Sequence, residues 1–109
     1  MEVRRGDLWS VAGGVYASKP RPALILQSDR FDETASITVA PFTTDPTEAP
    51  LLRVRIVPDG GNGLRAVCRI MIDKITTVAR SGLGARIGRL SGEDLNRVNR
   101  AVVVFLGIG

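Results

Sequence analysis

The stretch KPRPALILQSD, residues 19–29, constrains the fold of this 109-residue chain more than any other segment. Its apolar run, residues 22–27, has the length of a β-strand and is bounded by proline before it and by polar residues after it. A short continuous apolar run of this kind is typical of a central strand that is buried on both faces. Because proline has no N–H to donate, we expect Pro22 at the first position of this strand and residues 12–20 in a loop before it.

Other short segments of the chain also have the alternation or the β-branched composition of strands. In RVRIV, Arg53 and Arg55 fall on one face of the strand and the apolar residues on the other. The sequence PDGGNG predicts a turn, because glycine and asparagine readily adopt positive φ. The further predicted strands are residues 7–11, 37–43, 52–57, 64–78 (one long or bent strand) and 85–90.

The last part of the chain predicts an α-helix. Ser91 is a candidate N-cap with Asp94 three residues later, and Gly107 is a candidate stop. Many strands followed by one helix predict a mainly β fold, in which a strongly bent antiparallel sheet or half-barrel packs against the C-terminal helix in a single domain, residues 1–109. The apolar stripe expected to face the sheet comprises Leu95, Val98, Val102, Phe105 and Leu106.

The charge of the chain favours a nucleic-acid partner. Fifteen basic residues against eleven acidic ones give a net charge of +4, and thirteen of the basic residues are arginines. Arginine binds phosphate in a bidentate manner and stacks on bases. A small, arginine-rich basic domain is therefore typical of proteins that bind nucleic acids, although a GC-rich genome would also enrich arginine.

The absence of histidine and the single cysteine exclude several kinds of chemistry. A Ser-His-Asp triad is impossible, and a zinc site lacks its usual ligands, so we expect neither a metal nor another cofactor. Cys68 has no disulfide partner in the chain and is interpreted as a small core residue rather than a nucleophile. With neither a secretory signal nor an apolar stretch long enough to span a membrane, we expect a cytoplasmic protein with no membrane contact.

Several motifs, in order and spacing, resemble the MazF/PemK family of type II toxin–antitoxin systems. They are RRGDLWSV, RPALILQSD, VAPFT, IDKITTVA and IGRLSGEDLNRVNRAVVVFLGI, which together extend from Arg4 to Ile108. The resemblance implies a homodimeric SH3-like barrel, the CcdB/MazF-like fold. It also implies a metal-independent, sequence-specific endoribonuclease toxin that cleaves single-stranded RNA, and a MazE-like antitoxin that binds across its active groove.

The resemblance also implies a catalytic site. The family places an arginine just before the second strand and a threonine at the end of the third, and these positions match Arg21 and Thr43. An acidic position on the long strand matches Asp73, but the arginine that some relatives carry two residues earlier is Met71 here. The nearest arginine on that strand face is Arg69, and a histidine that some relatives use in the first loop is absent.

These residues suit a reaction in which RNA supplies its own nucleophile, the 2′-OH. The expected products are a 2′,3′-cyclic phosphate and a 5′-OH, whether the target is mRNA, rRNA or tRNA, and cleavage would inhibit translation and growth. Arg21 fits the role of stabilising the phosphorane, because a guanidinium binds two phosphate oxygens at once. Thr43 can donate a hydrogen bond to a phosphate oxygen. Asp73 is the one candidate for a general base, with a structural pairing to Arg69 or Lys74 as its alternative.

A second set of residues is predicted to bind the RNA, although each has a structural alternative. Tyr16 in the first loop either stacks on a base or anchors the loop. Trp9 is interpreted as a core or interface residue rather than a stacking platform. The arginines of the set either line an RNA groove or form a solvated strand face. The predicted RNA-binding residues are Tyr16, Lys19, Thr44, Arg53, Arg55 and Arg69, and residues 12–19 and 58–64 are the loops expected to determine sequence specificity.

Two other functions remain open at this stage. A non-enzymatic poison of DNA gyrase, like CcdB, has the same fold and ends in Trp-Gly-Ile, whereas this chain has Leu106 in place of that tryptophan. A catalytically silent nucleic-acid-binding module is the other alternative. The presence of Arg21 and Thr43 favours RNA cleavage over both.

Overall fold

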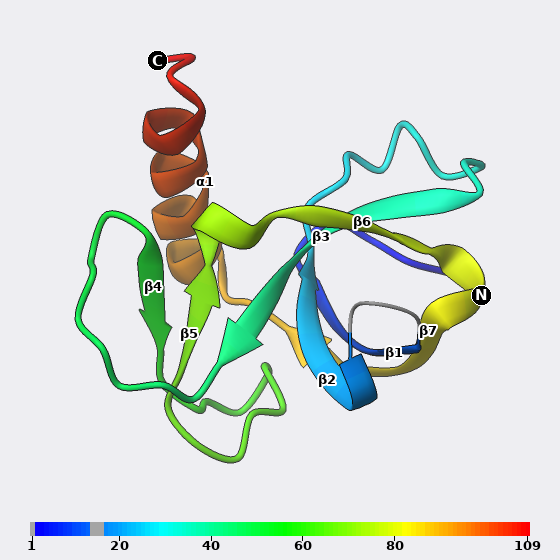
Figure 1. The fold of residues 1–109 in the computed structure, drawn as a ribbon, viewed down its shortest axis with the longest axis horizontal. Coiled ribbons are helices and arrows are strands. Elements are labelled where there is room, and N and C mark those ends of the chain that lie inside the picture. The colour runs from blue at the N-terminus through cyan, green and yellow to red at the C-terminus, as the bar shows by residue number, and fades with distance from the viewer. Residues whose placement is uncertain (1, 14–16) are drawn as a thin grey trace.

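The computed structural model describes residues 2–13 and 17–109, and Figure 1 shows their arrangement. The described residues form a mainly β fold with one α-helix at the C-terminus, as the sequence predicts. The strands are β1 (Asp7–Gly13), β2 (Ala17–Ile25), β3 (Ser36–Thr43), β4 (Arg53–Ile56), β5 (Cys68–Met71), β6 (Thr76–Ala79) and β7 (Leu83–Arg89). Two 3-10 turns, η1 (Ile72–Lys74) and η2 (Arg80–Gly82), precede α1 (Gly92–Leu106).

Strand β3 connects the two halves of the sheet. The strand order is β4-β5-β3-β2-β1-β7, β6 also pairs with β3, and the pairs are antiparallel. In Figure 1, β4 and β5 lie beside α1, whereas β1, β2 and β7 lie on the other side of β3. The sheet is therefore strongly bent about β3, which agrees with the predicted architecture.

Strand β2 is buried on both faces, as its continuous apolar run predicts. Leu24 packs in the core cluster that includes Val98 of α1, whereas Ala23 and Ile25 pack in a second cluster with Trp9. Both clusters are formed by residues with less than a tenth of their surface exposed. Alternating side chains of one strand thus contribute to two separate cores, because successive side chains point to opposite faces.

The start of β2 differs from the prediction. The strand begins at Ala17 rather than at Pro22, so Lys19 and Arg21 lie within β2 and not in a loop before it. Proline is tolerated at this internal position because pairing with β3 begins only at Ala23, leaving the earlier part of β2 paired on one side alone.

The predicted long strand at 64–78 is interrupted. Strands β5 and β6 both pair with the same edge of β3, but in different registers: Phe42 is opposite Ile70, whereas Val39 is opposite Thr76. Between these two pairs β3 has two residues, whereas the segment that joins β5 to β6 has five. The extra residues of that segment are accommodated in η1. Asp73 consequently lies in a 3-10 turn beside the sheet and not on a strand.

The helix begins and ends where the sequence predicts. The Ser91 hydroxyl oxygen accepts a hydrogen bond from the Asp94 N–H at 3.1 Å, and Gly107 ends the helix at a φ of 70°. The apolar stripe is buried only in its first half, where Val98 is fully buried. Phe105 and Leu106 were expected to face the sheet but are 44% and 55% exposed, because the last turn of α1 extends beyond the sheet in Figure 1.

The predicted turn at 58–63 is confirmed and is held tightly. Asn62 is fully buried, its Oδ1 accepts the backbone N–H groups of Asp59 and Leu64, and its Nδ2 donates to the Val57 carbonyl. Gly63 has a φ of 72°, a conformation that favours glycine. These contacts fix the backbone of the loop.

Candidate functional site

Arg21 is an exposed cation on a stiff stretch of β2. It is the cross-strand partner of Val11, and the prolines on either side restrict the backbone to an extended conformation. Within the part of the chain that the structure describes, its guanidinium forms no hydrogen bond or ion pair. Lys19, two residues earlier on the strand, is also exposed. Both charges are thus available to a ligand.

Thr43 ends β3 with a hydroxyl that is ready to donate. Its Oγ1 accepts a hydrogen bond from the Asp45 N–H at 3.1 Å. Since a hydroxyl accepts through its lone pairs and donates through its single proton, this contact leaves the Thr43 proton free for another acceptor. Thr44 follows the strand and is exposed.

Arg21 and Thr43 lie just beyond the last pair between β2 and β3. Ala23 is the cross-strand partner of Pro41, and Arg21 precedes Ala23 by two residues as Thr43 follows Pro41 by two. The β2–β3 ladder ends at Ala23, and the end of β3 pairs instead with β5. The two candidate catalytic residues therefore flank the point where β3 passes from one half of the sheet to the other.

Arg69 lies next to Thr43 on the other side. Thr43, Arg69 and Arg55 form a row of direct cross-strand partners over β3, β5 and β4, so their side chains share one face. The Arg69 side chain is only 9% exposed, and its Nη2 donates to the Glu48 Oε1 at 2.7 Å. The row places a desolvated cation beside the Thr43 hydroxyl.

Asp73 holds Arg53 in a two-point contact. The Arg53 Nε lies 3.0 Å from Oδ1 and its Nη2 lies 3.1 Å from Oδ2. The hydrogen bonds from Arg53 lower the pKa of the Asp73 carboxyl, against a smaller opposing effect of burial. A carboxylate with both oxygens engaged and a lowered pKa is a weak proton acceptor. Arg53 is the cross-strand partner of Met71, so its guanidinium extends beyond Met71 from the neighbouring strand to reach Asp73.

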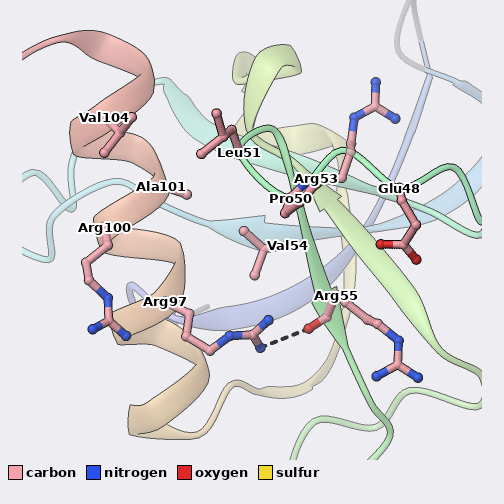
Figure 2. A pocket seen from close by; sticks show the side chains of 10 residues that line it. All are labelled: Glu48, Pro50, Leu51, Arg53, Val54, Arg55, Arg97, Arg100, Ala101 and Val104. Atoms are coloured by element: carbon pink, nitrogen blue, oxygen red, sulfur yellow. Dashed lines mark hydrogen bonds between the residues drawn. The ribbon is translucent and has the colours of Figure 1, made fainter.

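The opposite face of β4 borders a groove of about 330 Å³ between this strand and α1 (Figure 2). Val54 points toward the helix, whereas the Arg53 and Arg55 side chains point away from it. The Arg97 Nη1 donates to the Arg55 carbonyl at 2.9 Å across one end of this groove. The Arg55 side chain thus points away from the helix, but the groove adjoins the arginine row, because Glu48, Arg53 and Arg55 are among the residues that line it.

Three other predictions can be compared with the structure. Trp9 is 5% exposed in the core, which confirms its structural interpretation, and its indole N–H has no hydrogen-bond partner among the described residues. Cys68 is a buried core residue, and burial raises the pKa of its thiol, so the less reactive protonated form is favoured. Tyr16 lies outside the described residues.

Sequence reasoning missed the role of Glu48 and the pairing of Arg53 with Asp73. The partners of these two contacts are 21 and 20 residues apart in the chain. Only the register of β3, β4 and β5 brings them together, and no spacing motif in the sequence encodes that register. The alternation of RVRIV correctly predicted the shared face of Arg53 and Arg55, which is the one local signal of the site.

The described residues contain neither a cluster of metal ligands nor a membrane-spanning helix. They contain no group of three or more Cys, Asp and Glu side chains arranged to hold a metal ion. No helix in residues 2–13 and 17–109 is long and apolar enough to cross a membrane.

The chain has clear relatives. Residues 4–106 match a family described as PemK-like, MazF-like toxin of type II toxin–antitoxin system. A probable endoribonuclease MazF of Mycolicibacterium smegmatis (strain ATCC 700084 / mc(2)155) is 58% identical over 107 residues, which is 97% of this chain and 98% of the relative.

Several solved structures have the same fold as this chain. A mycobacterial endoribonuclease in complex with its cognate antitoxin superposes with a TM-score of 0.80 at 22% identity, covering 99% of this chain and 98% of the other. The Mycobacterium tuberculosis toxin MazF-mt6 also gives a TM-score of 0.80, at 24% identity, covering 94% of this chain and 98% of that toxin. These similarities confirm the predicted MazF-like fold.

Proposed function

This chain belongs to the family of PemK-like, MazF-like toxins of type II toxin–antitoxin systems, and from this premise we propose that it is a toxin that cleaves single-stranded RNA as an endoribonuclease. The observation that carries the proposal is that a cation without a partner among the described residues, Arg21, and a free hydroxyl proton, on Thr43, each lie two residues beyond the last β2–β3 pair. A phosphodiester between them would receive charge and a hydrogen bond together. The CcdB-like alternative, a gyrase poison, has no support in this family assignment.

In the proposed reaction, the RNA 2′-oxygen forms a bond to phosphorus while the bond from phosphorus to the 5′-oxygen breaks. The products are a 2′,3′-cyclic phosphate and a 5′-OH. Arg21 binds the non-bridging oxygens, on which negative charge develops, and the Thr43 hydroxyl donates a hydrogen bond to one of them. A single preorganised donor of this kind contributes about 3 to 4 kcal/mol to transition-state stabilisation.

The proton of the 2′-OH must also be removed, and the departing 5′-oxygen must gain a proton, which water supplies. For Asp73 to accept it, Arg53 would first have to release one of the two carboxylate oxygens that it holds. The contacts of Asp73 therefore favour a positioning role, in which Asp73 holds Arg53 toward the RNA backbone. The alternative is that Asp73 acts as the general base. Lys19, Thr44, Arg53, Arg55 and Arg69 are proposed to bind the RNA on either side of the scissile phosphate.

We propose a metal-independent reaction in the cytoplasm, where RNA is the substrate. The test is to incubate the purified protein with long single-stranded RNA in excess EDTA and to map the cut sites and their termini. Cleavage at a short recurring word, blocked by a 2′-deoxy substitution at the cut, is the expected result. Loss of cutting in EDTA would contradict metal independence, and cutting of the 2′-deoxy substrate would contradict attack by the 2′-OH.

We propose that the protein forms a homodimer. The end of α1 and the neighbouring loop expose large apolar side chains, including Leu51 at 73%, Val104 at 59% and Ile108 at 71%. Leu51 and Val104 line the same groove beside α1. A small domain with such an apolar surface gains stability by burying it against a second copy. Sedimentation analysis should give a dimer for the wild type and a monomer for Val104→Glu, and a monomeric wild type would contradict the proposal.

A cognate antitoxin is the second proposed partner. One structural neighbour of the same fold is an endoribonuclease in complex with its cognate antitoxin. A basic RNA-binding face is well suited to an acidic peptide that is disordered before it binds. We expect an acidic, MazE-like antitoxin to abolish RNA cleavage at a stoichiometric ratio, and binding without inhibition would place the antitoxin away from the site.

A further inference from the structure

Arg69 and Glu48 form an unequal ion pair. The Arg69 side chain is 9% exposed, whereas the Glu48 side chain is 73% exposed, and one hydrogen bond of 2.7 Å joins them. The pair of Arg53 and Asp73 differs, because both side chains are partly buried and two hydrogen bonds connect them. A buried cation requires an anion, but an exposed carboxylate gains little from staying beside it.

Arg69 also retains binding capacity. A guanidinium has five N–H donors, and Glu48 is the one hydrogen-bond acceptor of the Arg69 side chain among the described residues. The Trp9 indole is the one fully buried side-chain donor without a partner in that part of the chain, so the remaining Arg69 nitrogens keep contact with solvent. A phosphate, which accepts two parallel N–H bonds, would satisfy more of them than the single Glu48 contact does.

The loop that carries Glu48 lies in the field of the arginine row. Residues 44–52 connect β3 to β4, and we refer to this segment, with its acidic residues Asp45 and Glu48, as the acidic loop. Hydrogen bonds from Thr47 are the main cause of the lowered pKa of Asp45, and the charges of Arg53 and Arg69 act in the same direction. The loop begins directly after Thr43, so its carboxylates lie close to the proposed scissile phosphate.

We propose that Glu48 is an exchangeable counter-ion of Arg69: it occupies the guanidinium in the free protein, and an RNA phosphate adjacent to the one held by Thr43 displaces it. This inference rests on the proposed function, because it assigns a regulatory contact to the same RNA site. The acidic loop then acts as an internal competitor, which compensates the charge of Arg69 in the free protein and weakens the binding of RNA by the strength of the displaced contact.

The test compares Glu48→Gln with the matched control Glu33→Gln. Glu33 is an exposed acid outside the acidic loop with no ion pair in the described structure, so both variants change the net charge equally. The probe is the mapped RNA word made non-cleavable by a 2′-deoxy substitution, and its affinity is measured at one fixed ionic strength because RNA binding depends strongly on salt.

Glu48→Gln should bind the probe about threefold to tenfold more tightly than the wild type, whereas Glu33→Gln should stay near the wild type. In the background of Arg69→Met the gain from Glu48→Gln should disappear. Equal affinities of the two glutamine variants, weaker binding by Glu48→Gln, or a gain that persists without Arg69 would each overturn the inference while leaving RNA cleavage intact. A wild type that neither binds nor cleaves RNA would instead overturn the proposed function, and the inference with it.

Discussion

Thr43 is flanked by two arginines whose surroundings are opposite. Arg21, on β2, is exposed and has no partner among the described residues. Arg69, on β5, is buried and paired with Glu48. The end of β3 thus lies between an exposed arginine, Arg21, and a largely buried one, Arg69.

The difference indicates how each arginine would contribute to catalysis. A hydrated guanidinium loses water when it binds a phosphate, and its removal leaves no unpaired group behind. A largely buried guanidinium has already lost most of its water during folding, so it is preorganised for an anion but makes the folded protein depend on having one. Arg21 should therefore affect activity alone, whereas Arg69 should connect activity with stability.

The largest expected effect is that of Arg21→Ala. Cleavage should fall by about 10²- to 10³-fold, because the main charge on the developing phosphorane is lost. The free energy of unfolding should change by less than about 0.5 kcal/mol, since the side chain is exposed. Single-turnover cleavage and urea unfolding of the same preparation measure both. Full activity in the variant would refute the assignment, and a large loss of stability would break the contrast with Arg69.

Thr43→Ala should come next, with a loss of about 10²-fold in cleavage from the missing hydrogen bond. Thr43→Ser is the matched control, because it keeps the hydroxyl that accepts the Asp45 N–H and donates to the phosphate. The serine variant should recover most of the rate in the same assay. Equal rates for the alanine and serine variants would show that the hydroxyl is not used.

Arg69→Met should separate the two arginines most clearly. Replacing a buried charged side chain by an apolar one of similar length should leave the free energy of unfolding unchanged or raise it by up to about 2 kcal/mol. Cleavage should nevertheless fall about 10-fold or more, because a preorganised cation is missing from the row. Arg55→Met, an exposed neighbour in that row, serves as the stability control and should shift unfolding by less than about 0.5 kcal/mol. A destabilised Arg69→Met would mean that the pair with Glu48 supports the fold.

The smallest effect concerns Asp73 and appears only in acid. Its pKa is lower in the folded protein than in the unfolded chain, so the stability from its contact with Arg53 is present at neutral pH. That stability, no more than about 1 kcal/mol, should be lost as the pH falls below about 4 through the folded pKa. Unfolding free energies of the wild type and Asp73→Asn should converge there. A constant difference down to the most acidic pH would contradict this account.

Much of the fold could be predicted from the local pattern of the sequence. The continuous apolar run of β2 predicted a strand buried on both faces, and Ser91 and Gly107 marked the two ends of α1. The predicted start of β2 was wrong. Proline is excluded from the interior of a strand that is paired on both sides, but this stretch of β2 is paired on one side alone. The exposure of Phe105 and Leu106 was not predictable either. Helical periodicity shows which face of a helix is apolar, but not how far along the helix the sheet covers that face.

The candidate site was predictable only through the family resemblance and the alternation of β4. Arg21 and Thr43 remain predictions as catalytic residues, although each lies two residues beyond the last pair between β2 and β3. The carboxylate partners of Arg53 and Arg69 depend on three strand registers and one loop conformation. Tertiary pairing determines such contacts, and a single sequence carries no local signal for them.

The excess of residues opposite β3 has an evolutionary consequence. The registers of β5 and β6 on this strand are set independently, on either side of η1. Because Ile72 is fully buried in the core, a single insertion or deletion is expected to be tolerated only after it, where it would leave both strand pairings in place and redirect the acidic residue that the turn presents. Homologous chains could therefore differ in the position of this carboxylate while they keep the same two strand pairings.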